Sequence, residues 1–227
     1  MSTPFDAASA TGRRAVGVGR VRVKVCGLTR ATDALLAERL GVDAVGVIFA
    51  AGSRRRVDLA LGAEVVAPLS PFVTRVGVFR SPAVGEVMAA IERLRLHAVQ
   101  LHGEVDEGWL RELRPRVAVI RALAWRPGLD LDGLDAAGAD ALLIDGPEAG
   151  SGMPFDWRKA DGLLGSGDWI LAGGLHAGNV GEAIERLRPA AVDVASGVEA
   201  SAGVKDPARL AAFMAAVRGA ETVGGEP

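Results

Sequence analysis

The chain has 227 residues, of which 49% are hydrophobic and 24% charged, a composition typical of a soluble globular protein with a sizeable core. Its 26 basic and 28 acidic residues leave a formal charge of −2, which gives no electrostatic reason to expect a nucleic acid or an anionic membrane as partner. The single cysteine, Cys26, excludes an internal disulfide and fits a reducing cytoplasm, and no apolar run approaches the roughly 18 residues of a membrane span.

Residues 1–20 are small, polar and arginine-containing, and they lack the apolar block of a secretory signal. Asp6 argues against a transit peptide. We therefore expect a flexible N-terminal extension and a cytoplasmic protein.

From Val21 onward, short runs rich in β-branched residues alternate with longer amphipathic stretches, which indicates βαβ units around a parallel sheet. The pattern predicts strands at 21–26, 43–49, 73–79, 97–101, 117–123, 140–145, 168–172 and 190–195. It predicts helices near 30–40, 58–68, 82–95, 106–114, 129–137, 157–164, 177–187 and 207–218.

Two of these helices have explicit start signals. Ser81-Pro82 and Asp206-Pro207 each place a capping side chain before a proline, whose missing N–H costs nothing at the first helical position. Apolar residues then recur at helical spacing, so both helices should cover a buried sheet.

The eight strand–helix pairs follow one another without a break in composition, which favours a single (β/α)8 TIM barrel. A doubly wound sheet would usually show fewer strands and a glycine-rich fingerprint after the first, and Cys26-Gly27-Leu28-Thr29 lacks that fingerprint. We expect the barrel to be the catalytic domain over 21–218, followed by a flexible tail over 219–227.

Chemistry in such barrels lies at the C-terminal ends of the strands, and two of the predicted ends carry reactive groups. Cys26 ends the first strand and Asp145 ends the sixth. A lone cysteine is commonly a small buried hydrophobe, and a terminal carboxylate can cap a loop. Both residues also suit catalysis, the thiolate as base or nucleophile and the carboxyl as an acid or base of raised pKa.

The last two predicted strands end in Gly173-Gly174 and in Ser196-Gly197. Glycines there let backbone N–H groups approach an anion, and this is where barrels of this kind repeatedly bind phosphate. The sequence therefore predicts a phosphorylated ligand.

Other strand ends carry polar groups. Arg55, in a run of three arginines after the second strand, suits an anionic substrate group or a solvated loop. Gln100 and His102 alternate with Leu101, so both should face the barrel mouth, either as substrate ligands or as a satisfied polar network.

From about Val21 to about Arg218, the chain resembles the phosphoribosylanthranilate isomerases of tryptophan biosynthesis. The residues of the matching segments agree with the family pattern, and so do the order and spacing of the segments along the chain. The most specific segments are 23–29 (VKVCGLT), 75–79 (RVGVF), 99–103 (VQLHG), 150–152 (GSG) with 155–157 (FDW), and 193–199 (DVASGVE).

The resemblance implies an Amadori rearrangement of N-(5′-phosphoribosyl)anthranilate to 1-(2-carboxyphenylamino)-1-deoxyribulose 5-phosphate, the third step of tryptophan synthesis from chorismate. This aldose–ketose isomerisation needs no cofactor or metal, because the substrate nitrogen stabilises the ring-opened iminium. By resemblance, Asp145 is the general acid, Cys26 is the general base, and Arg55 engages the anthranilate carboxylate. The residues implied for the phosphate are Gly173, Gly174, Ser196 and Gly197, and those implied for the rest of the pocket are Gln100, His102 and Asp193.

The chain departs from the family pattern at two places. Met153-Pro154 replaces a lysine-containing loop, and Ala195 replaces the first serine of a Ser-Ser-Gly. These changes bear on loop closure and substrate affinity rather than on the acid or base. The implied partner is one small phosphorylated substrate, and the chain is expected to be a monomer or homodimer.

Several rivals fit the residues less well. The histidine-pathway isomerase of the same fold would have a carboxylate at the end of the first strand and two similar halves. A Schiff-base aldolase would need a lysine at a strand end, and a metal hydrolase would need ligand spacing that His97, His102 and His176 lack. A barrel that binds a phosphorylated metabolite without turning it over would have no use for a cysteine–aspartate pair.

Overall fold

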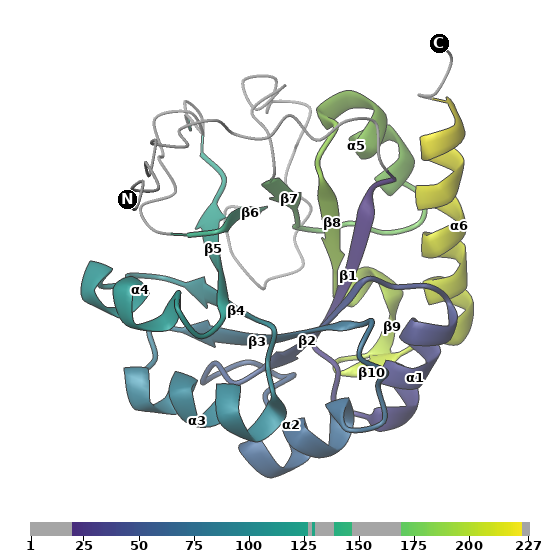
Figure 1. The fold of residues 1–227 in the computed structure, drawn as a ribbon. Helices are drawn as coiled ribbons and strands as arrows, with labels where there is room; N and C mark the ends of the chain where they lie inside the picture. The colour runs from purple at the N-terminus through teal and green to yellow at the C-terminus, as the bar shows by residue number, and fades with distance from the viewer. Residues whose placement is uncertain (1–19, 127–128, 130–138, 147–168, 224–227) are drawn as a thin grey trace, which may run out of the picture.

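The structure, a computed structural model, describes residues 20–126, 129, 139–146 and 169–223 (Figure 1). Eight parallel strands pair in chain order, and β8 pairs with β1 to close the barrel. Each predicted strand is present within one residue of its expected bounds, so the TIM barrel is confirmed. The strands are β1 (Arg22–Cys26), β2 (Ala44–Ile48), β3 (Thr74–Arg80), β4 (Ala98–His102), β5 (Ala118–Ala124), β6 (Ala141–Asp145), β7 (Trp169–Leu171) and β8 (Ala191–Val194).

The helices lie outside the strands (Figure 1). They are α1 (Ala31–Arg39), α2 (Leu59–Val66), α3 (Val84–Leu94), α4 (Glu107–Leu113), α5 (Val180–Leu187) and α6 (Pro207–Val223). Apart from Leu129, the helices predicted at 129–137 and 157–164 fall outside the described residues. No helix in the described part of the chain is long and apolar enough to cross a membrane.

The ends of two helices differ from the predictions. Asp206 caps α6 as expected, accepting from the backbone N–H groups of Ala208 and Arg209 at 2.9 and 3.0 Å. The Ser81-Pro82 start signal is wrong, because Ser81 adopts a left-handed conformation (φ 43°) and α3 begins only at Val84.

Helix α6 continues to Val223 instead of ending at 218. The extra turn packs against the rest of the protein, since Ala220 is buried. It lies beside α5, because a Cβ built on Gly181 would be 4.0 Å from the Ala220 Cβ.

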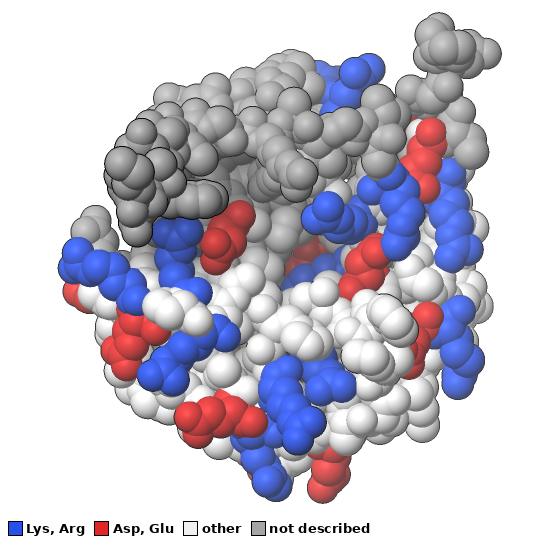
Figure 2. Space-filling view, in the orientation of Figure 1, with Lys and Arg blue, Asp and Glu red and all other residues white. Residues whose placement is uncertain are grey.

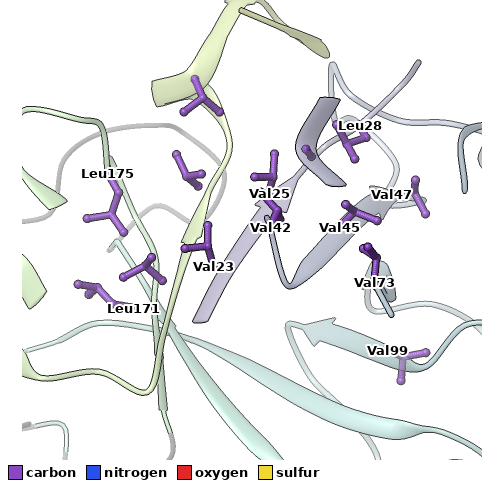
Figure 3. Packing of buried hydrophobic residues seen from close by; sticks show 14 of the residues in the cluster. Val23, Val25, Leu28, Val42, Val45, Val47, Val73, Val99, Leu171 and Leu175 are labelled. Carbon is purple, nitrogen blue, oxygen red and sulfur yellow. The ribbon is translucent and has the colours of Figure 1, made fainter. Parts of the chain in front are cut away.

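Alternation along the strands divides the apolar side chains into two sets. Val25 of β1 and Val45 of β2, which are register partners, belong to the large cluster between the barrel and its helices (Figure 3). The barrel interior holds two smaller clusters, formed by Cys26, Val76, Val78 and Ala98 and by Ala122, Leu143 and Ala172. The same alternation points Asp145, two residues after Leu143, into the barrel mouth.

A short turn and β-hairpin after β8 were not predicted. A 3-10 turn, η3 (Ser196–Val198), leads into an antiparallel pair of strands, β9 (Glu199–Ser201) and β10 (Val204–Lys205). Gly203 makes the turn possible, because its φ of +81° is a conformation that favours glycine. The hairpin brings Glu199 and Lys205 back beneath the ends of β1 and β8, where both are buried.

Candidate active site

A cavity of about 450 Å³ lies at the C-terminal ends of the barrel strands. Every predicted site residue except Gly197 lines it: Cys26, Arg55, Gln100, His102, Asp145, Gly173, Gly174, Asp193 and Ser196. The face in Figure 2 carries acidic and basic side chains interspersed, without a broad patch of one sign.

Gly197 packs behind the cavity. A Cβ at this position would lie 1.9 Å from the carbonyl oxygen of Leu175, so the loops after β7 and β8 approach too closely for any other residue. Gly173 (φ +92°) and Gly174 (φ +66°) take left-handed conformations at the cavity wall. A Cβ on Gly173 would be 2.6 Å from the backbone nitrogen of Gly146, which places the end of β7 directly against that of β6.

Cys26 shares the barrel interior with a buried ion pair. Lys24 Nζ lies 2.8 Å from Asp193 Oδ2, and the charge of the same ammonium acts on the Cys26 thiol. Burial raises the pKa of the Cys26 thiol, the Lys24 ammonium opposes this shift, and the Asp193 carboxylate adds to it. Burial alone would lower the pKa of Lys24, but the charges of Asp193 and Cys26 raise it, so the lysine carries its charge beside the thiol.

Asp145 stands at the end of β6, half-buried, with its carboxylate toward the cavity. Its Oδ1 accepts a hydrogen bond from the N–H of Gly146 at 2.8 Å. The same oxygen lies 3.2 Å from the position that a Cβ on Gly173 would occupy. Asp145 therefore borders the glycines predicted to bind phosphate.

Arg55 is held by a buried network that the sequence analysis missed. Glu199 accepts from Arg55 Nε and Nη2, both at 2.8 Å, and from Lys205 Nζ at 2.8 Å. Lys205 Nζ also donates to the carbonyl oxygens of Cys26 at 2.7 Å and Ala195 at 3.2 Å. The network joins the loop after β2 to the ends of β1 and β8. Glu199 raises the pKa of Arg55, whose guanidinium stays charged.

Gln100 and His102 point the same way, as alternation predicted, and both line the cavity. Gln100 Nε2 lies 2.8 Å from His102 Nε2. Burial, with the charges of Lys24 and Arg80, lowers the pKa of His102 to about 4. The imidazole is therefore neutral at pH 7, and its Nε2 accepts from the Gln100 amide.

Further residues line the cavity without having been predicted. Arg80 was missed because β3 runs one residue beyond its expected end, and a basic residue ending a strand was the available signal. Lys24 is not among the residues that line the cavity, but its position two residues before Cys26 places it on the same inward face of β1. Among the described residues, no group of three His, Cys, Asp or Glu side chains is arranged to hold a metal ion.

Residues 23–216 match the family model of N-(5′-phosphoribosyl)anthranilate (PRA) isomerase. The N-(5′-phosphoribosyl)anthranilate isomerase of Pseudomonas aeruginosa (strain UCBPP-PA14) is 44% identical over 205 residues, 87% of this chain and 95% of that protein. Phosphoribosyl anthranilate isomerase from Thermus thermophilus superposes with a TM-score of 0.82 at 42% identity, covering 88% of this chain and 99% of that one. Another such isomerase, in complex with reduced 1-(o-carboxyphenylamino)-1-deoxyribulose 5-phosphate, gives a TM-score of 0.76 at 34% identity and the same coverage, 88% and 99%. This chain therefore belongs to the N-(5′-phosphoribosyl)anthranilate isomerase family.

Proposed function

We propose that this protein isomerises N-(5′-phosphoribosyl)anthranilate to 1-(2-carboxyphenylamino)-1-deoxyribulose 5-phosphate, as an aldose–ketose isomerase of tryptophan biosynthesis in the cytoplasm. One observation carries the proposal: a single cavity contains a buried thiol, a carboxylate, a fixed arginine and paired glycines. These groups match a substrate that carries a phosphate, a carboxylate and a sugar carbon to be deprotonated.

The substrate phosphate belongs at the ends of β7 and β8. Gly173, Gly174 and Ser196 line this part of the cavity, and glycines there expose backbone N–H groups that a side chain would otherwise cover. Gly197 lies behind the same loop, where a Cβ would collide with the carbonyl oxygen of Leu175.

The anthranilate carboxylate belongs on Arg55. Glu199 occupies Nε and one hydrogen of Nη2, which fixes the plane of the guanidinium. None of the described residues is recorded as bonded to the opposite edge, formed by Nη1 and the second hydrogen of Nη2, so this edge suits a bidentate bond to a carboxylate.

The chemistry requires one acid and one base. Asp145 gives a proton to the ring oxygen while the C1′–O bond breaks and the anilino nitrogen lone pair forms an iminium. The Cys26 thiolate then removes the C2′ proton, and the electron pair of that C–H bond forms the C1′=C2′ double bond as the iminium is neutralised. The resulting enolamine tautomerises to the ketone. Electrons stay within the substrate, so the reaction needs no oxidant, reductant or cofactor.

The thiol should show its own pH dependence in the empty site. Because burial raises the pKa of Cys26, the thiol predominates over the thiolate at neutral pH. Only the thiolate reacts with iodoacetamide, so we predict that alkylation of Cys26 accelerates steadily as the pH rises from about 7 to 9. Second-order rate constants in constant-ionic-strength buffers would measure this, and a rate independent of pH over that range would contradict a raised pKa for this thiol.

The proposed function is tested by turnover of N-(5′-phosphoribosyl)anthranilate, followed by the change in anthranilate fluorescence. Purified protein dialysed against a chelator should convert this substrate and should leave the aminoaldose of the histidine pathway unchanged. Binding of the product analogue without turnover would identify a non-catalytic barrel instead. Sedimentation equilibrium would show whether the chain is a monomer or a homodimer.

A further inference from the structure

Lys205, on β10, is a charged residue buried behind the candidate active site. The residue is 2% exposed, and its side chain has no exposed surface at all. Burying an ammonium is costly, and an apolar side chain would serve a purely structural role at least as well. Only three of the 26 basic residues are lysines, and two of them, Lys24 and Lys205, are buried beside Cys26. This placement points to a function for the charge itself.

Three hydrogen bonds fix the Lys205 ammonium at the end of β1. Its Nζ donates to the carbonyl oxygen of Cys26 at 2.7 Å, to that of Ala195 at 3.2 Å and to Glu199 Oε1 at 2.8 Å. An ammonium has three hydrogens, so these bonds use all of them. The Lys205 backbone is fixed as well, because its N–H donates to Asp33 Oδ2 at 2.9 Å. The positive charge is therefore held in one place, and it is bonded to the residue that carries the thiol.

The position of this charge matters because the Cys26 thiol is buried among few other charged groups. Apolar side chains of β3 and β4 pack against it, and Arg55 in the loop after β2 interacts with it electrostatically. Burial raises the pKa of the thiol, the charges of Lys24 and Lys205 lower it, and that of Asp193 raises it further. Asp193 lies 2.8 Å from Lys24, so these two neighbours act on the thiol in opposite directions.

Lys205 has a different counter-ion. Glu199, which pairs with it, is not among the principal charges that act on the thiol. Glu199 is also shared with Arg55, whose Nε and Nη2 both donate to it at 2.8 Å. Burial lowers the pKa of Lys205, whereas the charges of Glu199 and Cys26 raise it. The ammonium and a thiolate at Cys26 therefore favour each other's charged form.

Resting on the proposed function, we infer that Lys205 is a positioning residue for the Cys26 base: its ammonium fixes the end of β1 from behind and supplies positive charge that lets the thiolate form in the buried site. Glu199 keeps this ammonium charged and in place. The same carboxylate holds Arg55, so one buried ion pair prepares both the base and the arginine proposed to bind the substrate carboxylate.

The test is a pH titration of Cys26, followed by the ultraviolet absorbance of the thiolate. The chain contains one cysteine and no tyrosine, so neither a second thiolate nor a tyrosinate adds to the signal. In Lys205→Met, the midpoint should lie about one pH unit higher than in the unmodified protein, the low end of the shift that a nearby charge produces. Alkylation of Cys26 by iodoacetamide at neutral pH should slow by about threefold, since the smaller thiolate fraction is partly offset by a more nucleophilic thiolate.

The direction of the change separates this role from a merely structural one. Loss of a purely structural lysine would loosen the end of β1 and admit water to the thiol. The midpoint would then fall, because burial is the main cause that raises it. Loss of a stabilising charge raises the midpoint instead.

Two further variants complete the test. Glu199→Gln with Lys205→Met removes both charges of the pair together, so it provides the measurement if Lys205→Met does not fold, and its midpoint should also be raised. Arg114→Met is the matched control, since it removes one positive charge from an exposed ion pair with Asp140, which precedes β6 at the opposite end of the barrel. Its midpoint should equal that of the unmodified protein.

An unchanged or lowered midpoint in the Lys205 variants would overturn the inference, and so would a rise of the same size in Arg114→Met. The proposed function is judged separately, by turnover of N-(5′-phosphoribosyl)anthranilate in the unmodified protein. Absence of turnover together with a raised midpoint in Lys205→Met would reject the proposed function, while the effect of Lys205 on the thiol would stand.

Discussion

At the scale of single residues, Gly46 shows how tightly Cys26, the proposed base, is confined. It pairs with Cys26 across β1 and β2, and a Cβ at this position would lie 2.9 Å from the Cys26 Sγ and 3.3 Å from the Lys24 Cε. We predict that Gly46→Ala displaces both groups and lowers kcat/KM by about 10- to 100-fold, because small displacements of reacting groups are costly.

The matched control for this variant is Gly85→Ala on α3, where a Cβ would meet nothing within 4 Å. It should keep full activity and gain up to about 1 kcal/mol of stability, since alanine favours helix over glycine. Steady-state kinetics on both variants would check the prediction, and normal kcat/KM in Gly46→Ala would show that the base is not confined there.

His102 makes stability depend on pH. Its pKa falls to about 4 in the folded protein, so between that value and the usual 6.5 the unfolded chain binds the extra proton. Unfolding free energy should therefore be fully present above pH 6.5 and should decrease by up to about 3 kcal/mol as the pH drops toward 4.

Urea unfolding at a series of pH values would measure this effect. In His102→Gln the slope between pH 6.5 and 4 should be smaller, because the substituted side chain does not titrate. An identical slope in the variant and in the unmodified protein would assign the pH dependence to other groups.

Several site residues could be predicted individually, because each follows from a local pattern. Cys26 and Asp145 end predicted strands, and the shared direction of Gln100 and His102 follows from alternation. The partner of Asp193 could not be predicted this way. Its ion pair with Lys24 joins positions 169 residues apart, and it depends on the register in which β8 meets β1.

At the scale of elements, the β9–β10 hairpin is the principal feature that the pattern did not predict. Its strands have three and two residues, too few for an alternation to appear, and the conformation of Gly203 provides the turn. Capping signals were similarly ambiguous, since Asp206 begins α6 while Ser81 does not begin α3.

The hairpin should matter for both stability and affinity. Lys205 is buried, and its ammonium bonds Glu199, the Cys26 carbonyl and the Ala195 carbonyl. We predict that Lys205→Met lowers the unfolding free energy by about 3 kcal/mol, because it leaves buried acceptors without their donor, and that it raises KM by loosening Arg55.

Arg114→Met, which breaks an exposed ion pair with Asp140, provides the comparison and should cost less than about 1 kcal/mol. Chemical denaturation and steady-state kinetics would measure both variants. Equal stability of Lys205→Met and Arg114→Met would show that the buried network contributes little.

At the scale of the whole molecule, barrel closure brings the site together. Residues at the ends of β1, β4, β6 and β8 meet at one cavity because each strand carries its polar residue at its C-terminal end. The strand count and chain order that lead to closure were predictable from the eightfold repeat of apolar runs. The buried ion pairs across the closed barrel were not, since they arise only after distant strands are in register.

The central claim is that Cys26 and Asp145 perform the proton transfers in a site that binds substrate independently of them. The most direct measurement is kcat for N-(5′-phosphoribosyl)anthranilate in Cys26→Ser and Asp145→Asn, alongside the affinity of each variant for the reduced product analogue. We predict that kcat falls by about 10²- to 10⁴-fold in both while affinity changes by less than about tenfold. Near-normal kcat in either variant would contradict the assignment of that residue.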